Sequence, residues 1–159
     1  MNKNLLFVTN HNTNKNDTIL INHLNNIGYN VSTYYELSQA YLQLKKHNIA
    51  IIILNQVNCE LNCLTFIKKI RENNKLKDIP ILVLNKEINK NTNKLWSAGV
   101  DFFLYEPDII DNLELVVRSL IIRYESTLNG RMYNIKDNDY FKLEGSKKKN
   151  IEFIPILHS

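Results

Sequence analysis

The stretch Ile49-Ala50-Ile51-Ile52-Ile53-Leu54-Asn55 decides the fold of this chain. Its six consecutive apolar residues are too few for a helix of average length and too uniformly apolar for a strand with one face in water. Such a run is typical of a central strand that is buried on both faces of a parallel sheet. Open α/β sheets bind their ligands in the crevice outside the carboxyl ends of the strands. Asn55, which ends the run, therefore marks the place to look for chemistry.

Apolar runs and helical patterns alternate on both sides of this stretch. Leu5 to Val8 forms a second apolar run, and apolar residues recur at helical spacing between Asn14 and Ile27. Strands are expected at 5–8, 29–34, 49–55, 79–84 and 101–105, and helices at 14–27, 36–46, 64–71, 89–98 and 108–124. This alternation predicts an α/β fold with a five-stranded, doubly wound parallel sheet and helices on both of its faces.

Polar residues close four of the five predicted strands. Because the carboxyl ends of parallel strands meet at the same edge of a sheet, these residues should gather there. They are Thr9, Asn10, Asn55, Asn85 and Glu106. The chain has 25 Asn among its 159 residues, so an Asn at one of these positions is weak evidence by itself.

Length and composition fit one domain with a tail. A hydrophobic content of 44% is enough for a core, and the formal charge of +4 comes from interspersed acidic and basic residues, so charge alone does not indicate nucleic-acid binding. No apolar run approaches the length of a membrane span and the N-terminus lacks the layout of a signal peptide. We therefore expect a cytoplasmic protein without a membrane partner.

The two cysteines, Cys59 and Cys63, lie four residues apart at a predicted junction between loop and helix. A zinc site would need further ligands nearby, and the sequence shows none. We expect both thiols to be reduced and structural.

Over residues 3 to 125, the chain resembles the receiver domain of two-component response regulators. The resemblance rests on three segments: 66–71, which is similar to that family's third helix; 78–84, similar to its fourth strand; and 98–107, similar to its fifth-strand signature. It implies a receiver-like domain over 1–125, with strand order 2-1-3-4-5, and a C-terminal extension over 126–159.

The resemblance also assigns the site positions, and each one departs from the family's pattern. The phosphoacceptor position holds Asn55, and the acidic pair is replaced by Thr9 and Asn10. The switch positions are Asn85, Phe103 and Glu106, the last standing where a Lys belongs.

These departures remove the chemistry of the family. The neutral amide of Asn55 is no nucleophile comparable to a carboxylate, and Thr9, Asn10 and Asn55 offer Mg²⁺ no carboxylate. Glu106 would repel a phosphoryl group. We therefore expect no enzymatic activity, no metal, no cofactor, and a neutral pocket that is stable without Mg²⁺. An alternative is that Glu106 or His11 serves a rebuilt site.

The surfaces of the domain remain available for function. In receivers, the fourth helix, fifth strand and fifth helix form the face used for dimers and partners. Here the candidate interface residues on that face are Trp96, Phe103 and Tyr105. We expect a non-catalytic, phosphorylation-independent pseudo-receiver that binds a signalling or regulatory protein, or a second copy of itself, in bacterial signal transduction or transcription regulation.

Two alternatives stay open. The extension has three candidate short strands, at 132–135, 140–143 and 151–156, and faintly resembles the strand platform of winged-helix output domains. It stops before a recognition helix, so a DNA-associated response regulator is the less favoured interpretation. The weaker alternative is a sensor that binds a small ligand in the pocket bounded by Asn10, Asn55 and Asn85.

Overall fold

The computed structural model describes residues 2–10, 15–55, 61–128 and 151–152, and all structural statements below refer to these ranges. Strands and helices alternate along the chain, as the sequence predicts. In order they are β1 (Asn4–Val8), α1 (Lys15–Asn26), β2 (Asn30–Tyr34), α2 (Leu37–Lys46), β3 (Ile51–Asn55), α3 (Leu61–Glu72), β4 (Ile81–Asn85), α4 (Thr92–Ala98), β5 (Phe102–Tyr105), α5 (Ile109–Leu128) and β6 (Ile151–Glu152).

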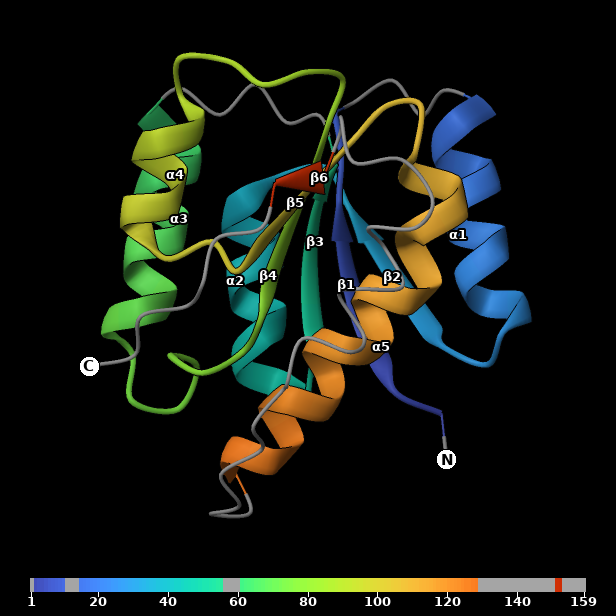
Figure 1. The fold of residues 1–159 in the computed structure, drawn as a ribbon. Coiled ribbons are helices and arrows are strands. Elements are labelled where there is room, and N and C mark those ends of the chain that lie inside the picture. The colour runs from blue at the N-terminus through green and yellow to red at the C-terminus, as the bar shows by residue number, and fades with distance from the viewer. Residues whose placement is uncertain (1, 11–14, 56–60, 129–150, 153–159) are drawn as a thin grey trace.

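The sheet has the strand order β2-β1-β3-β4-β5-β6. All pairs among the first five strands are parallel, which confirms the predicted fold class and the order 2-1-3-4-5. Helices α1 and α5 cover one face of the sheet, and α2, α3 and α4 cover the other (Figure 1). Every strand-to-strand crossover therefore runs through a helix, as parallel pairing requires.

Strand β3 lies at the centre of the molecule, between β1 and β4. All five of its residues are buried. Ile52 and Leu54 pack in the core on the side of α2, α3 and α4, and Ile51 and Ile53 pack on the side of α1 and α5. Burial of one such side chain contributes about 1.5–3 kcal/mol, so the stretch 49–55 joins both halves of the core.

The predicted boundaries differ from the observed ones where local chemistry intervenes. β4 begins at Ile81, because Pro80 has no N–H to give to a ladder; its carbonyl still accepts a hydrogen bond from Ile52 N at 2.9 Å. Helix α4 ends at Gly99, whose φ of +116° is the left-handed conformation that glycine adopts at helix ends. Helix α5 runs to Leu128, three residues past the predicted domain boundary.

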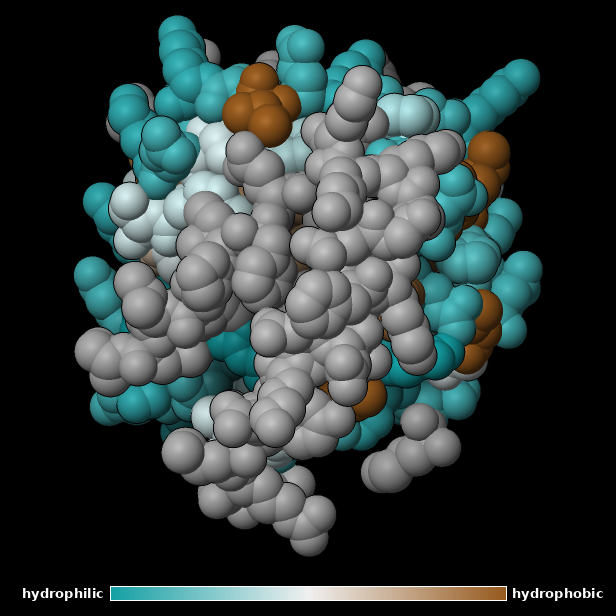
Figure 2. Space-filling model, in the orientation of Figure 1, coloured by the Kyte–Doolittle hydropathy of each residue, from teal (hydrophilic) through white to brown (hydrophobic). Residues whose placement is uncertain are grey.

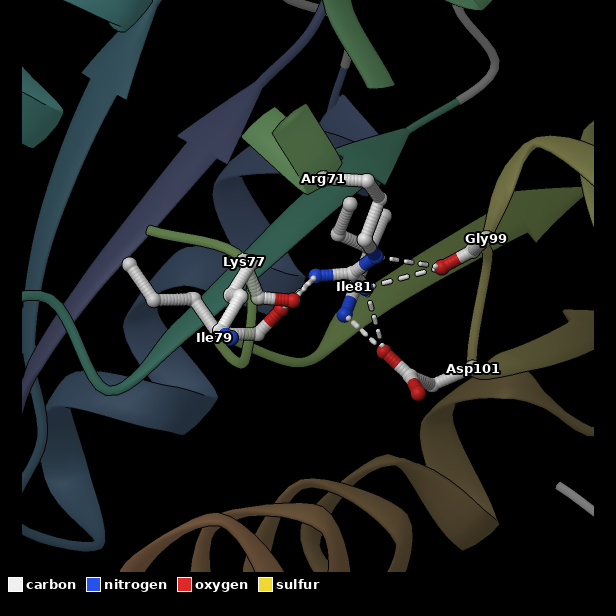
Figure 3. A network of polar contacts seen from close by, with 6 residues as sticks. All are labelled: Arg71, Lys77, Ile79, Ile81, Gly99 and Asp101. Atoms are coloured by element: carbon white, nitrogen blue, oxygen red, sulfur yellow. Dashed lines mark hydrogen bonds and ion pairs between the residues drawn. The ribbon is translucent and has the colours of Figure 1, made fainter. Parts of the chain in front are cut away.

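A network around Arg71 ties three segments together at the edge of the sheet where β4 and β5 begin (Figure 3). Arg71 lies at the end of α3 and its guanidinium donates to backbone carbonyls on both sides. Nη1 donates to the oxygens of Lys77 and Ile79 at 2.8 and 2.7 Å, and Nε and Nη2 donate to Gly99 O at 3.0 and 2.8 Å. The end of α3, the entry to β4 and the end of α4 are thereby held by one side chain.

Asp101 completes this network. Its Oδ2 accepts from Arg71 Nη2 and from the backbone N of Ile81, both at 2.8 Å. Burial lowers the pKa of Arg71, and the carboxylate of Asp101 opposes that shift. The ion pair is mostly shielded from water, with side-chain exposures of 21% for Arg71 and 13% for Asp101.

Strand β6 and residues 126–128 at the end of α5 are the described parts of the predicted C-terminal extension. The strand pairs antiparallel with β5, with Ile151 opposite Leu104 and Glu152 opposite Phe103. It falls within the predicted strand 151–156, whereas the candidates 132–135 and 140–143 lie outside the described residues. The division into a domain over 1–125 and an extension over 126–159 stays a prediction.

The coloured residues on the face drawn in Figure 2 are mostly hydrophilic. Figure 2 shows separate apolar residues set among hydrophilic ones, which is ordinary for a folded domain. No helix in the described ranges is both long enough and apolar enough to cross a membrane.

Candidate functional site

The candidate site lies where β1 and β3 end. These strands are paired neighbours, with Val8 opposite Leu54. Thr9 follows β1 and Asn55 ends β3, and both are buried, at 4% and 2% exposure. The structure therefore brings two of the predicted site positions into one pocket.

A third residue, Asp17, connects them. It lies in the first turn of α1 and is 3% exposed. Its Oδ2 accepts a hydrogen bond from Thr9 Oγ1 at 2.7 Å, and its Oδ1 accepts one from Asn55 Nδ2 at 2.5 Å. A carboxylate in the first turn of a helix is also stabilised by the helix dipole. We call Thr9, Asp17 and Asn55 the carboxylate triad.

The prediction of a neutral pocket is therefore wrong. Thr9 and Asn10 are not acidic, but α1 supplies a carboxylate that contacts Thr9 and Asn55. One signal in the sequence could have found it, because Asp17 is the one acidic residue among residues 1–35. Asp17 lies on a predicted helix, eight residues beyond Thr9, so the sequence pattern did not predict that it contacts the strand ends.

The hydrogen bond to Asp17 fixes the orientation of the Asn55 amide. A carboxylate only accepts hydrogen bonds, so the amide must turn its NH₂ group toward Asp17. This leaves Asn55 Oδ1 buried, with no hydrogen-bond donor among the described residues. The pocket thus presents one unpaired acceptor at the phosphoacceptor position.

The residues of the triad do not fit Mg²⁺. The ion is bound by one or two carboxylates together with other oxygen ligands. Here both oxygens of Asp17 already accept hydrogen bonds, and Asn55 directs a donor, not an acceptor, toward that carboxylate. Within the described ranges, no group of three or more His, Cys, Asp or Glu side chains is placed to hold a metal ion.

The other predicted site positions differ from Thr9 and Asn55 in their exposure. Asn10 is exposed, and Asn85 and Glu106 are partly exposed. Glu106 N donates to Asn85 O at 3.1 Å, so the ends of β4 and β5 are linked through backbone atoms. His11 lies outside the described residues.

The candidate interface residues form an aromatic row along β5 and α4. The Trp96 and Phe103 ring centroids are 4.7 Å apart, and the Phe103 and Tyr105 rings are nearly parallel at 6.1 Å. Phe103 and Tyr105 are buried, at 0% and 1% exposure, and Trp96 is partly buried. Of the three side chains, Trp96 is the one that offers surface to a partner, and the interface stays a prediction.

Cys63 is buried and disulfide-bonded. The expectation that it is a reduced thiol is therefore wrong. The other cysteine of the chain, Cys59, lies outside the described residues.

No family model matches the chain, and no curated protein matches it. Solved structures do match. A response regulator from Chloroflexus aurantiacus, described as putative, superposes with a TM-score of 0.68 at 22% identity, covering 77% of this chain and 100% of that one.

Two further matches are informative. The receiver domain of a sensor histidine kinase from Pseudomonas aeruginosa, with magnesium in its active-site cleft, gives a TM-score of 0.66 at 19% identity, covering 76% of this chain and 98% of that one. The beryllofluoride-activated NtrC4 receiver domain dimer gives 0.64 at 22% identity, with the same coverage of both chains. The chain therefore has the receiver-domain fold.

Proposed function

We propose that this chain is a non-catalytic pseudo-receiver, which acts through protein contacts in bacterial signal transduction or transcription regulation without being phosphorylated. The observation that carries the proposal is the hydrogen bond from Asn55 to Asp17. It places an amide where a receiver needs its nucleophile, and it engages the carboxylate that would otherwise be left to bind a metal.

The chemistry of phosphoryl transfer supports this proposal. Aspartyl phosphorylation needs a carboxylate that can reach the phosphorus atom and a metal that neutralises the developing charge. Asn55 has an amide in place of the carboxylate that this reaction needs. Asp17 is a carboxylate, but it is 3% exposed and would have to release both Thr9 and Asn55 before it could attack.

If the domain transfers no phosphoryl group, it can still function by binding other proteins. One of the similar solved structures is a receiver domain dimer, and receiver folds are small enough to act through their outer faces alone. In this chain, the partner would meet a domain whose pocket is held in one hydrogen-bonded state instead of switching between two.

A magnesium titration tests the proposal. We expect the melting temperature of the full chain to be unchanged by millimolar Mg²⁺, and its sedimentation coefficient to be unchanged by acetyl phosphate with Mg²⁺. The Asn55→Asp variant is the matched comparison, because it places a second carboxylate beside Asp17 and should become sensitive to Mg²⁺. A rise in the melting temperature of the wild type with Mg²⁺ would contradict the proposal.

The unpaired Asn55 Oδ1 favours one second candidate, a sensor for a small hydrogen-bond donor. A buried acceptor without a donor costs about 1–3 kcal/mol, and a ligand N–H or O–H would recover part of that cost. Thermal-shift screening with small amines and alcohols tests this idea. A genuine ligand should stabilise the wild type more than an Asn55→Ala variant, and no stabilisation of the wild type by any compound would rule the candidate out.

A further inference from the structure

An open groove runs between α2 and α3, on the face of the sheet away from α1 and α5. Its volume is about 700 Å³. It is lined by aromatic and aliphatic side chains together with polar ones: Tyr35, Glu36, Leu37, Ser38, Tyr41, Leu42, Asn62, Thr65, Phe66 and Lys69. The groove uses neither the carboxylate triad nor the aromatic row on β5.

Aromatic side chains form the middle of the groove. Tyr41 and Phe66 meet edge to face, with ring centroids 6.5 Å apart. Leu42 beside them is 54% exposed, and Tyr35 near one end is 44% exposed. Large apolar side chains left this exposed along a concave surface are typical of a protein contact site.

Two lysines lie beside Tyr41: Lys69 lines the groove, and Lys45 lies next to it in the last turn of α2. Lys45 Nζ lies 5.1 Å from the centre of the Tyr41 ring, and Lys69 Nζ lies 5.9 Å from it. Both distances are within the range of a cation–π contact. The ring of Tyr41 therefore contacts two ammonium groups at once, although their positive charges repel each other.

Among the described residues, neither ammonium group forms an ion pair with an acidic side chain. Glu36, the acidic residue of the groove, immediately precedes α2, whereas Lys45 lies in the last turn of that helix. The groove therefore has an acidic residue where α2 begins and basic residues beside Tyr41, toward the end of α2. Complementary charge would fix the direction of a bound segment.

We propose that the α2–α3 groove docks an amphipathic helix of a partner protein, with apolar anchors on Tyr41, Leu42 and Phe66 and an acidic residue against Lys45 and Lys69. A helix presents anchors at spacings of three and four residues, which suits a groove between two helices. Small-molecule sites enclose most of their ligand, whereas this groove is open along the surface. The proposal goes beyond the pseudo-receiver function and does not depend on the chemistry at Asn55.

Selection from a displayed library of random 16-residue peptides tests the proposal. The full chain is the target, and the Lys45→Ala/Lys69→Ala variant serves for counter-selection. We expect the enriched peptides to carry apolar residues three or four apart, followed about one turn later by Asp or Glu. Synthetic copies should bind the wild type, with an affinity that falls as salt is added because the charges are exposed.

A matched control variant distinguishes peptide binding in the groove from a general effect of positive charge on binding. Lys46→Ala/Lys68→Ala removes the same two charges from the same two helices, at exposed positions that do not line the groove. We expect Lys45→Ala/Lys69→Ala and Leu42→Asp each to weaken binding by about tenfold or more. The Lys46→Ala/Lys68→Ala control should bind like the wild type.

Several results would overturn the proposal. These are an absence of enriched peptides, enriched peptides without acidic residues, or an equal loss of affinity in both lysine pairs. A dimer of the wild type that Leu42→Asp disperses would assign the groove to a second copy of the chain instead. Because the Asn55 site is tested separately with Mg²⁺ and acetyl phosphate, failure here leaves the proposed function standing.

Discussion

The two ends of the sheet hold their charged groups in different ways. Where β4 and β5 begin, Arg71 is paired with an opposite charge, Asp101, and donates to three carbonyl oxygens on two segments, the entry to β4 and the end of α4. Where β1 and β3 end, the carboxylate of Asp17 is held by the neutral donors of Thr9 and Asn55. The first end joins elements of the fold through an ion pair, and the second holds a buried carboxylate between two neutral donors.

Under the proposed function, this difference would allow the receiver fold to persist without phosphoryl-transfer chemistry. The Arg71 network joins α3, α4 and the entries to β4 and β5 without using any of the phosphoryl-transfer positions. Substitutions at Thr9, Asn10 or Asn55 therefore leave that network intact. We expect substitutions in the network to cost more stability than substitutions in the triad.

The largest effect should come from Arg71→Ala. The change removes five hydrogen bonds, one of which is the ion pair with the mostly buried carboxylate of Asp101. Breaking a buried pair from one side costs about 3–5 kcal/mol, measured as the free energy of unfolding in urea. Arg118→Ala, which breaks an exposed pair with Glu114 on α5, is the control and should cost less than about 0.5 kcal/mol. Equal losses in the two variants would disprove the architectural role.

A smaller loss should follow Gly99→Ala. The glycine has a φ of +116°, and a Cβ there would lie 2.8 Å from Arg71 Nε and 2.9 Å from Arg71 Cγ. We expect a cost of about 2–3 kcal/mol from backbone strain together with displacement of Arg71. Gly28→Ala is the matched control, because Gly28 has a φ of +104° but open space around its Cα. The difference between the two unfolding free energies isolates the contact with Arg71.

Asp17→Ala should cost less again. It leaves the buried Asn55 Nδ2 and Thr9 Oγ1 without their acceptor, but it also relieves the burial of a charge. We expect a loss of about 1–2 kcal/mol in urea unfolding. Asp17→Asn keeps the shape and one acceptor oxygen and should cost less than Asp17→Ala. A loss larger than that of Arg71→Ala would reverse the comparison between the two ends.

The smallest effect is expected at alkaline pH. Burial raises the pKa of Tyr124, and the nearby carboxylate of Asp78 raises it further. A raised pKa in the folded state means that stability is fully present below the unfolded pKa, near 10, and is lost as pH rises through the folded value. Tyr124→Phe should therefore lose less stability than the wild type between about pH 9 and pH 11. Tyr35→Phe, at an exposed ring, is the control, and identical curves for wild type and Tyr124→Phe would contradict the expectation.

The fold was predictable because its signal is local. The six consecutive apolar residues before Asn55 indicate a central strand. In the neighbouring helices, apolar residues recur at spacings of three and four residues. The contacts that the sequence did not predict join residues that lie far apart along the chain. Arg71 meets Gly99 and Asp101 across 28 and 30 residues, and no periodicity in the sequence encodes that meeting.

The candidate site was predicted only in part. Thr9 and Asn55 follow from the rule that strand ends share an edge, so their meeting was foreseeable. Asp17 belongs to a helix, and whether its side chain turns toward the strand ends depends on how α1 packs against β1 and β3. The pairing of β6 with β5 is likewise a contact between distant segments.

The most direct test of the account is intact-mass spectrometry of the full chain after incubation with acetyl phosphate and Mg²⁺. Asn55→Asp and Asp17→Asn are measured beside the wild type. The account predicts that the wild type gains no phosphoryl group, because Asn55 is an amide and Asp17 is buried and hydrogen-bonded. A wild type that gains one phosphoryl group would contradict it, and loss of that group in Asp17→Asn would identify Asp17 as the acceptor.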